Sequence, residues 1–385
     1  MTPTLWLSCH VHYACRHSGV CCTAGWPLPV EDVVVPAIEA AMAHGRLTTR
    51  DGRAAWLLES AEAPMGMAGT LRQPDGACVF HRPRAGVSGG ASHECAVHGT
   101  LGHEALPSTC QHFPRIALID DRGVRVSLSH VCPTALDLLL SHDGPVAIVS
   151  GPAAVPGRDV PEGLDARGEL PPALTDRVLM DLDTLTQWEA HVVGMLAGAA
   201  PMAGSVDTVV AALVGQADAL TAWRPGQTSL ATAAGELLAR APVVAEATDA
   251  GLSDEAVAVH ARVLASCRAP WAHPPAPDDI RALDARWVAP AWPAMAPLVR
   301  RYLAARAFGA WAQYQAEGLA GSARWLGTVL AVVRVEAARA AGASRRPLDR
   351  ERLGEAIRQA DLLLLHYADP AEAARAFDAS VHRRT

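Results

Sequence analysis

The segment from Tyr13 to Cys22 most constrains what this chain can fold into, because it holds three cysteines, Cys15, Cys21 and Cys22. A short loop containing glycine cannot bury adjacent thiols well, and thiols at this density are typical of metal or iron–sulfur sites. Five further cysteines lie in the first 132 residues, namely Cys9, Cys78, Cys95, Cys110 and Cys132. Cys267 stands apart, and we expect it to be a small buried hydrophobic residue.

These thiols are expected to be reduced. The N-terminus lacks a basic region followed by a long apolar run, and no segment offers about 18 uncharged apolar residues. The sequence therefore predicts a cytoplasmic protein without a membrane partner. In that compartment clustered cysteines favour metal binding over disulfides, and the odd total of nine points the same way.

Composition excludes several classes of function. The net charge is −7 and neither half of the chain is basic, so nucleic acid is not an expected partner. All 33 basic residues are arginine, which excludes Schiff-base lysine chemistry and a phosphate-binding Walker lysine. No dinucleotide-binding glycine motif follows a strand, and the zinc-protease, nucleophile-elbow and radical adenosylmethionine cysteine motifs are missing.

The apolar pattern predicts a mainly α protein. A Cys-rich N-terminal metal or iron–sulfur domain with a small β-hairpin is expected at 1–150, and an α-helical domain at 173–385. Between them, 151–172 holds five prolines and four glycines and reads as a linker. The hairpin is predicted at 115–119 and 124–128.

Local signals predict further elements. Pro29–His44 should be a helix ended by Gly45, Pro133 should begin a helix reaching Ser141, and 146–149 should be a short strand. A glycine-rich loop is expected at 82–93. Apolar residues spaced by three and four predict the remaining helices, at about 178–195, 205–221, 228–240, 253–267, 292–316, 320–341, 349–367 and 370–380.

The cysteines are the candidate ligands, since thiolates bind iron–sulfur clusters and, with histidine, tetrahedral zinc. The candidate set is Cys15, Cys21, Cys22, Cys78, Cys95, Cys110 and Cys132, with Cys9 as an eighth. Eight thiols could hold one [4Fe-4S] cluster with spares, two clusters, or one or two zinc ions. An extended backbone would point Cys21 and Cys22 apart, toward different irons or different sites. Nearby histidines keep a mixed zinc site open, namely His10, His12, His17, His98, His112 and His130.

These residues resemble the cysteine-cluster (CxxCxxCC) zinc- or iron-chelating family, and within it the flagellin lysine-N-methylase branch. The family opens with aromatic-x-Cys-x-x-Cys-Gly-x-Cys-Cys, which Tyr13, Cys15, Gly19, Cys21 and Cys22 match. Further matches are Trp26, Cys78-Val79-Phe80, Cys95, the run Leu106, Thr109, Cys110, Phe113, Pro114 and Arg115, and Cys132-Pro133. Ser18 stands where the family has its second cysteine, so Ser18 itself, Cys9 or a histidine would supply that donor.

The resemblance implies an iron–sulfur or zinc protein, and with it an enzyme that transfers methyl groups from S-adenosylmethionine to lysine side chains of a protein substrate. It names no catalytic residue. The alternatives are a non-catalytic zinc- or iron-binding protein and a redox sensor. Aromatic rings at Tyr13, Trp26, Trp56 and Phe113 would suit a cation, but packing in a core is the more common role of such rings.

Overall fold

The computed structural model describes residues 3–59, 64–83, 93–157, 161–168, 171–226, 228–240, 251–267, 276–314, 318–369 and 376. The predicted glycine loop at 82–93 and the predicted helix at 370–380 fall mostly outside these residues. Within them, none of the helices has the length and apolar character needed to cross a membrane.

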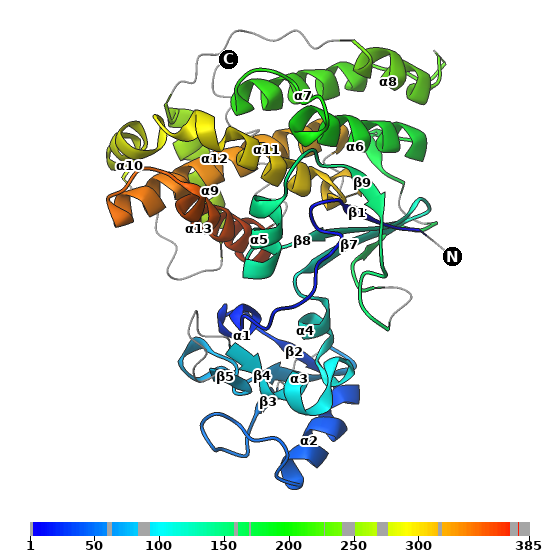
Figure 1. The fold of residues 1–385 in the computed structure, drawn as a ribbon. Coiled ribbons are helices and arrows are strands. Elements are labelled where there is room, and N and C mark those ends of the chain that lie inside the picture. Colours follow the sequence, from blue (N-terminus) through cyan, green and yellow to red (C-terminus); the bar gives the residue numbers. More distant parts are fainter. Residues whose placement is uncertain are drawn as a thin grey trace.

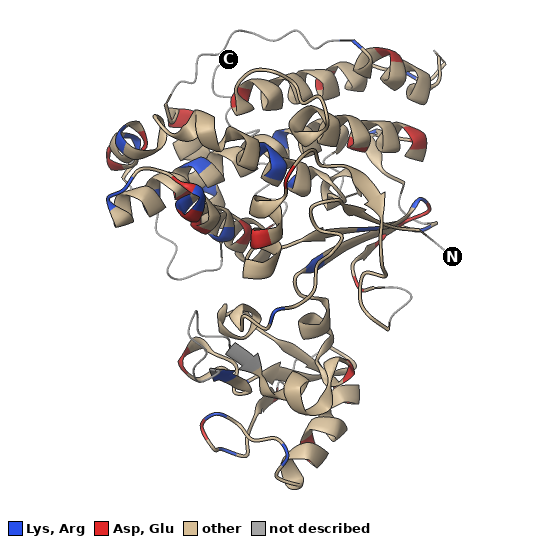
Figure 2. Cartoon of the chain, viewed as in Figure 1, with Lys and Arg blue, Asp and Glu red and all other residues tan. Residues whose placement is uncertain are grey.

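The protein is mainly α, as predicted. Figure 1 shows a large part in which helices lie above and beside a twisted sheet, and below it a small lobe formed by the residues that follow the first strand of that sheet and precede the next one along the chain. Figure 2 shows acidic and basic residues interspersed in both parts.

The main sheet brings the N-terminus beside the predicted hairpin. Its order is β10 (Leu164–Asp165), β7 (Arg115–Asp120), β8 (Gly123–Leu128), β1 (Thr4–Leu7) and β9 (Ile148–Ser150). β7 and β8 form the predicted antiparallel hairpin, whereas β1 lies parallel to β8. Gly123 is needed at the turn, because its φ is 126° and an added Cβ would lie 2.4 Å from the carbonyl oxygen of Pro3.

The small lobe has its own hydrophobic core, which includes Trp26, Ile38 and Phe80. The predicted helix at Pro29–His44 begins late, because Pro29–Glu31 pairs with a neighbouring strand as β2, and Gly45 follows its end at φ 68°. The lobe consists of α1 (Val20–Thr23), β2, α2 (Val35–Ala43), β3 (Leu57–Glu59), β4 (Met67–Leu71), β5 (His81–Pro83), β6 (His93–Cys95), α3 (Ala96–Leu101) and α4 (Ser108–His112). Its sheets are β2-β4-β3 and β5-β6.

Most helices of the body follow the predicted periodicity, but α10 (Pro277–Leu283) was not predicted, and two predicted helices differ from the structure. Val178 lies in a short hairpin of β11 (Ala173–Thr175) and β12 (Val178–Leu179), so the first helix starts at Leu182. The predicted helix at 292–316 ends at Ala307. The helices are α5 (Pro133–Ser141), α6 (Leu182–Ala197), α7 (Val206–Thr221), α8 (Leu230–Leu238), α9 (Asp254–Ser266), α10 (Pro277–Leu283), α11 (Trp292–Ala307), α12 (Gly318–Ser344) and α13 (Arg350–Asp361), which continues as a π-helical turn, Leu362–Tyr367.

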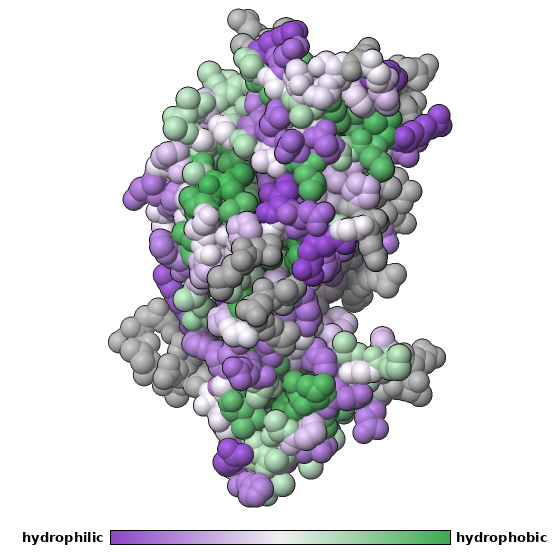
Figure 3. Space-filling view, turned by 90° about the vertical axis from the view of Figure 1, so that its right-hand side faces the viewer, coloured by the Kyte–Doolittle hydropathy of each residue, from purple (hydrophilic) through white to green (hydrophobic). Residues whose placement is uncertain are grey.

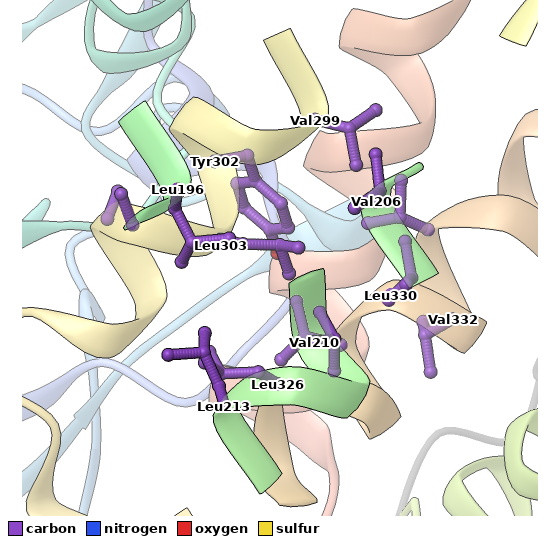
Figure 4. Close-up of a cluster of buried hydrophobic side chains, with 14 of the residues drawn as sticks. Leu196, Val206, Val210, Leu213, Val299, Tyr302, Leu303, Leu326, Leu330 and Val332 are labelled. Carbon is purple, nitrogen blue, oxygen red and sulfur yellow. The ribbon is translucent and has the colours of Figure 1, made fainter. Parts of the chain in front are cut away.

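α12 is the centre of the body and packs against α7, α9, α11 and α13. Figure 4 shows the core where α6, α7, α11 and α12 meet, with Tyr302 and Leu303 of α11 facing apolar side chains of the other helices. The division of the chain at 151–172 stays a prediction. Within that range β10 pairs in parallel with β7 of the main sheet.

The N-terminus of α6 offers a local test of this body. The carboxylate of Asp181 accepts a hydrogen bond of 2.7 Å from the backbone N–H of Thr184. Replacing Asp181 by alanine should lower the free energy of unfolding by about 1 kcal/mol, because an N-terminal donor loses its acceptor. Urea unfolding measures this change. Asp183→Ala, two residues further along the same helix, is the matched control, and an equal loss in both variants would contradict the capping role.

Candidate metal centre

Five of the predicted ligands gather in the small lobe, and we call them the thiol cluster: Cys21, Cys22, Cys78, Cys95 and Cys110. The sulfur atoms of Cys21 and Cys22 lie 3.9 Å apart, Cys78 and Cys95 lie close enough to raise the pKa of Cys22, and Cys110 lies within electrostatic range of Cys21, Cys78 and Cys95. They come from four separate segments of the chain. The fold therefore collects them from positions almost ninety residues apart.

Local structure explains how Cys21 and Cys22 can share one place. The segment is not extended, because Gly19 adopts φ 71° and starts the single helical turn α1. On this turn the two sulfur atoms lie 3.9 Å apart. The expectation that adjacent cysteines point apart assumed an extended backbone, which this segment does not have.

Backbone pairing positions the other three thiols. The N–H of Cys78 donates to the carbonyl oxygen of Cys22 over 2.7 Å, which holds the two segments together. Cys95 ends β6 and pairs with His81 of β5. Cys110 lies on the short helix α4, whose Ser108 N–H donates to both carboxylate oxygens of Glu31 at 3.1 and 3.2 Å.

The thiols of the cluster lie close enough to shift one another's pKa. The neighbouring thiols of Cys21, Cys78 and Cys95 raise the pKa of Cys22, while the hydrogen bond with Cys22 lowers the pKa of Cys21. Burial raises the pKa of Cys110 well above its usual value, and the neighbouring thiols raise it further. Cys21 is thus easier to ionise than its neighbour Cys22, whereas the Cys22 and Cys110 thiols resist ionisation beside other thiols, because like charges repel at short range.

Cys15 and Cys132 form a neighbouring group. The hydroxyl of Tyr13 lies 3.6 Å from Cys132 Sγ, and Arg115 stacks over the Tyr13 ring at 5.0 Å. Cys15 is exposed and accepts a hydrogen bond from the His17 N–H over 3.4 Å. Its electrostatic neighbours are Cys21 and Cys132, so it lies between this group and the thiol cluster.

The remaining cysteines lie elsewhere. Cys9 packs in the core of the helical body, where burial raises its pKa to about 12 and Arg301 opposes the rise. Cys267, half-buried after α9, has its pKa raised to about 11 by burial. Ser18 is half-buried in the loop before α1.

The six histidines near cysteines divide between surface and interior. His17 and His98 lie with ring centroids 4.8 Å apart at the edge of the small lobe. His112 accepts from the N–H of Glu162 over 2.8 Å. His10 and His130 are buried with their Nε2 atoms 3.2 Å apart, and His12 is exposed.

The four candidate aromatic rings do not form one wall. Trp56 packs on Phe80 at 5.8 Å within the lobe core, and Arg115 covers Tyr13. Trp26 and Phe113 do meet, with centroids 5.4 Å apart. A ring from the far end of the chain, His366, stacks on Trp26 at 4.5 Å.

The donor set of the thiol cluster fits a thiophilic metal, because five cysteines from four chain segments lie close enough to shift one another's pKa, with Cys21 and Cys22 Sγ 3.9 Å apart. Cysteine thiolates are ligands that zinc and iron–sulfur clusters share. In the described part of the chain, no three or more His, Cys, Asp or Glu groups already stand in a metal-binding arrangement. The thiols would therefore lose protons and draw closer when a metal binds.

The sequence analysis did not identify the C-terminal residues beside the cluster, such as His366 and Tyr367. No metal-ligand motif marks these residues in the sequence. Comparison with family models, curated proteins and solved structures finds no match to this chain.

Proposed function

We propose that the protein is a metal–thiolate protein whose centre is the thiol cluster. The observation that carries this proposal is the convergence of Cys21, Cys22, Cys78, Cys95 and Cys110 from four chain segments. Free thiols rarely gather in this way without a shared ligand, since each gains little from another thiol and the ionised forms repel.

The resemblance to lysine-N-methylases extends the proposal to a reaction. The centre would be a [4Fe-4S] cluster, and the enzyme would transfer methyl groups from S-adenosylmethionine to surface lysines of a protein substrate. An iron–sulfur cluster would supply redox and electrostatic chemistry at the lobe. The residues of this chain would hold it through cluster thiolates and shield it with the apolar core around Trp26 and Phe80.

A protein partner suits the surface of the small lobe. Three large apolar side chains, Val33, Leu58 and Met65, are exposed there, on or beside the β2-β4-β3 sheet. Figure 3 shows hydrophobic residues at the surface of this lobe, at the bottom of the view. Exposed apolar groups of this kind favour contact with another protein. We place the protein in the cytoplasm, where its nine free cysteines would remain reduced.

The second candidate is a non-catalytic zinc protein, and one distance favours it. Two sulfurs bound at about 2.3 Å to one tetrahedral zinc ion lie about 3.8 Å apart. Cys21 and Cys22 lie 3.9 Å apart. In a [4Fe-4S] cluster each cysteine binds a different iron, so the pair would have to separate.

Metal and sulfide analysis after anaerobic purification distinguishes these candidates. The proposed enzyme should contain about four iron and four sulfide per chain and a broad visible absorption. It should also bind S-adenosylmethionine, and deletion of its gene should remove methyl groups from lysines of a host protein, measured by mass spectrometry.

A colourless protein with one zinc per chain and no affinity for S-adenosylmethionine would support the second candidate. A chain without any bound metal would contradict both.

A further inference from the structure

We infer that the C-terminal segment Asp361–Tyr367 is a clamp that positions the thiol cluster, with His366 and Tyr367 as its positioning residues. This inference rests on the proposed metal centre. The segment lies more than three hundred residues from Cys22 in sequence. It contacts two chain segments where the small lobe meets the helical body. These are the segment after Cys22 and the segment before Cys132.

His366 forms the first contact of this clamp. Its ring stacks on Trp26, four residues after Cys22, with centroids 4.5 Å apart and planes 17° from parallel. Its Nε2 lies within hydrogen-bond distance, 2.9 Å, of the hydroxyl of Ser129. Burial lowers the pKa of His366 to about 4, so the ring is neutral at physiological pH and packs as an aromatic group. One side chain thus fixes Trp26 against the strand that leads to Cys132.

Tyr367 forms the second contact. Its hydroxyl donates to the carbonyl oxygen of Ala24 over 3.1 Å, two residues after Cys22. Gly25, at φ 81°, follows directly, and an added Cβ there would lie 3.6 Å from the same hydroxyl. Leu362 of the same turn packs against the core that contains Cys22 and Cys78. The C-terminal end of α1 is therefore held from outside the lobe.

Asp361 anchors the other side of the clamp. Its carboxylate accepts from the backbone N–H of His130 over 2.6 Å and from the His130 ring over 2.9 Å. Tyr302 and Arg306 of α11 bind the same carboxylate, so the anchor is part of the helical body.

A π-helical turn makes these contacts compatible. Leu362–Tyr367 is wider than an α-helix, which changes the direction of side chains relative to α13. Such turns are rare and occur frequently at functional sites. Here the turn directs Leu362, His366 and Tyr367 together toward the small lobe.

Alkylation kinetics test the clamp without requiring a bound metal. The full chain, as purified, is treated with iodoacetamide, and the rate at each cysteine is followed by mass spectrometry. In His366→Ala the cluster thiols should react about tenfold faster than in the wild type, because a stacked aromatic contact is lost. Tyr367→Phe should show a smaller increase, and so should His366→Phe, which keeps an aromatic ring against Trp26 but loses the contact with Ser129.

His191→Ala is the matched control, since His191 is half-buried and bonds Gln216 within the helical body. Unchanged cluster rates in His366→Ala would overturn the clamp. An equal increase in the alkylation rate of Cys9, in the core of the helical body, would also overturn it, because that result indicates global unfolding. Failure of the proposed metal centre is a separate result, the absence of metal from the wild type.

Discussion

Replacing Cys22 by serine should remove the bound metal, lowering the metal content per chain at least about tenfold. Cys22 is the residue whose pKa three other cluster cysteines raise, so its loss leaves the remaining donors without their common neighbour. Loss of even an outer partner of a metal ligand costs about 10- to 100-fold in affinity, and loss of a ligand itself should cost more. Elemental analysis with acid-labile sulfide measures the result.

The same experiment should separate cluster cysteines from the others. Cys21→Ser and Cys110→Ser should also lose metal, whereas Cys267→Ser is the control and should retain it, since Cys267 lies after α9 and contacts the backbone of Leu363. Circular dichroism on each variant shows whether the helical body remains folded. Full metal content in Cys22→Ser would mean that the centre lies elsewhere, for example at Cys15 and Cys132.

The helices and the hairpin were predictable because their signals are local. The apolar spacing in 182–197 and the turn Asp120–Gly123 act over a few residues, and the structure confirms both. The parallel pairing of β1 with β8 was not predictable, because it joins residues about 120 positions apart and no local pattern specifies it. For the same reason Pro29–Glu31 reads as helix in sequence but pairs as a strand.

Sequence also indicates which residues could bind metal, but not which of them meet. Cys22 and Cys78 are joined by a backbone hydrogen bond, and Cys95 depends on the pairing of β5 with β6. Cys9 follows the same compositional pattern, yet it lies in the turn after β1 and packs in the core of the helical body. His366 carries no metal-ligand signal at all, and only the packing of the π-helical turn on Trp26 reveals it.

Replacing Asp361 by asparagine should lower the free energy of unfolding by about 3 to 5 kcal/mol at pH 7, the usual cost of breaking a buried ion pair. Asp361 is fully buried and accepts from His130 and Tyr302, while Arg306 Nη1 lies 3.6 Å away. The neutral amide would leave the Arg306 guanidinium without its counter-charge. Asp218→Asn is the control, because its ion pair with Arg324 is more exposed and should contribute less than about 1 kcal/mol.

The stabilisation that Asp361 provides should decrease as the pH falls. Burial raises the pKa of Asp361, but the charge of Arg306 and hydrogen bonds from His130 and Tyr302 outweigh it, so the folded-state pKa lies below its usual value. A carboxyl with a lowered pKa stabilises the fold above its unfolded pKa of about 3.9, and this stabilisation is lost as the pH falls. The difference between wild type and Asp361→Asn in urea unfolding should therefore stay constant from pH 7 to 5 and shrink below about pH 4. A difference that grows with acidification would show that Asp361 is protonated in the folded protein, and that Arg306 is held by other groups.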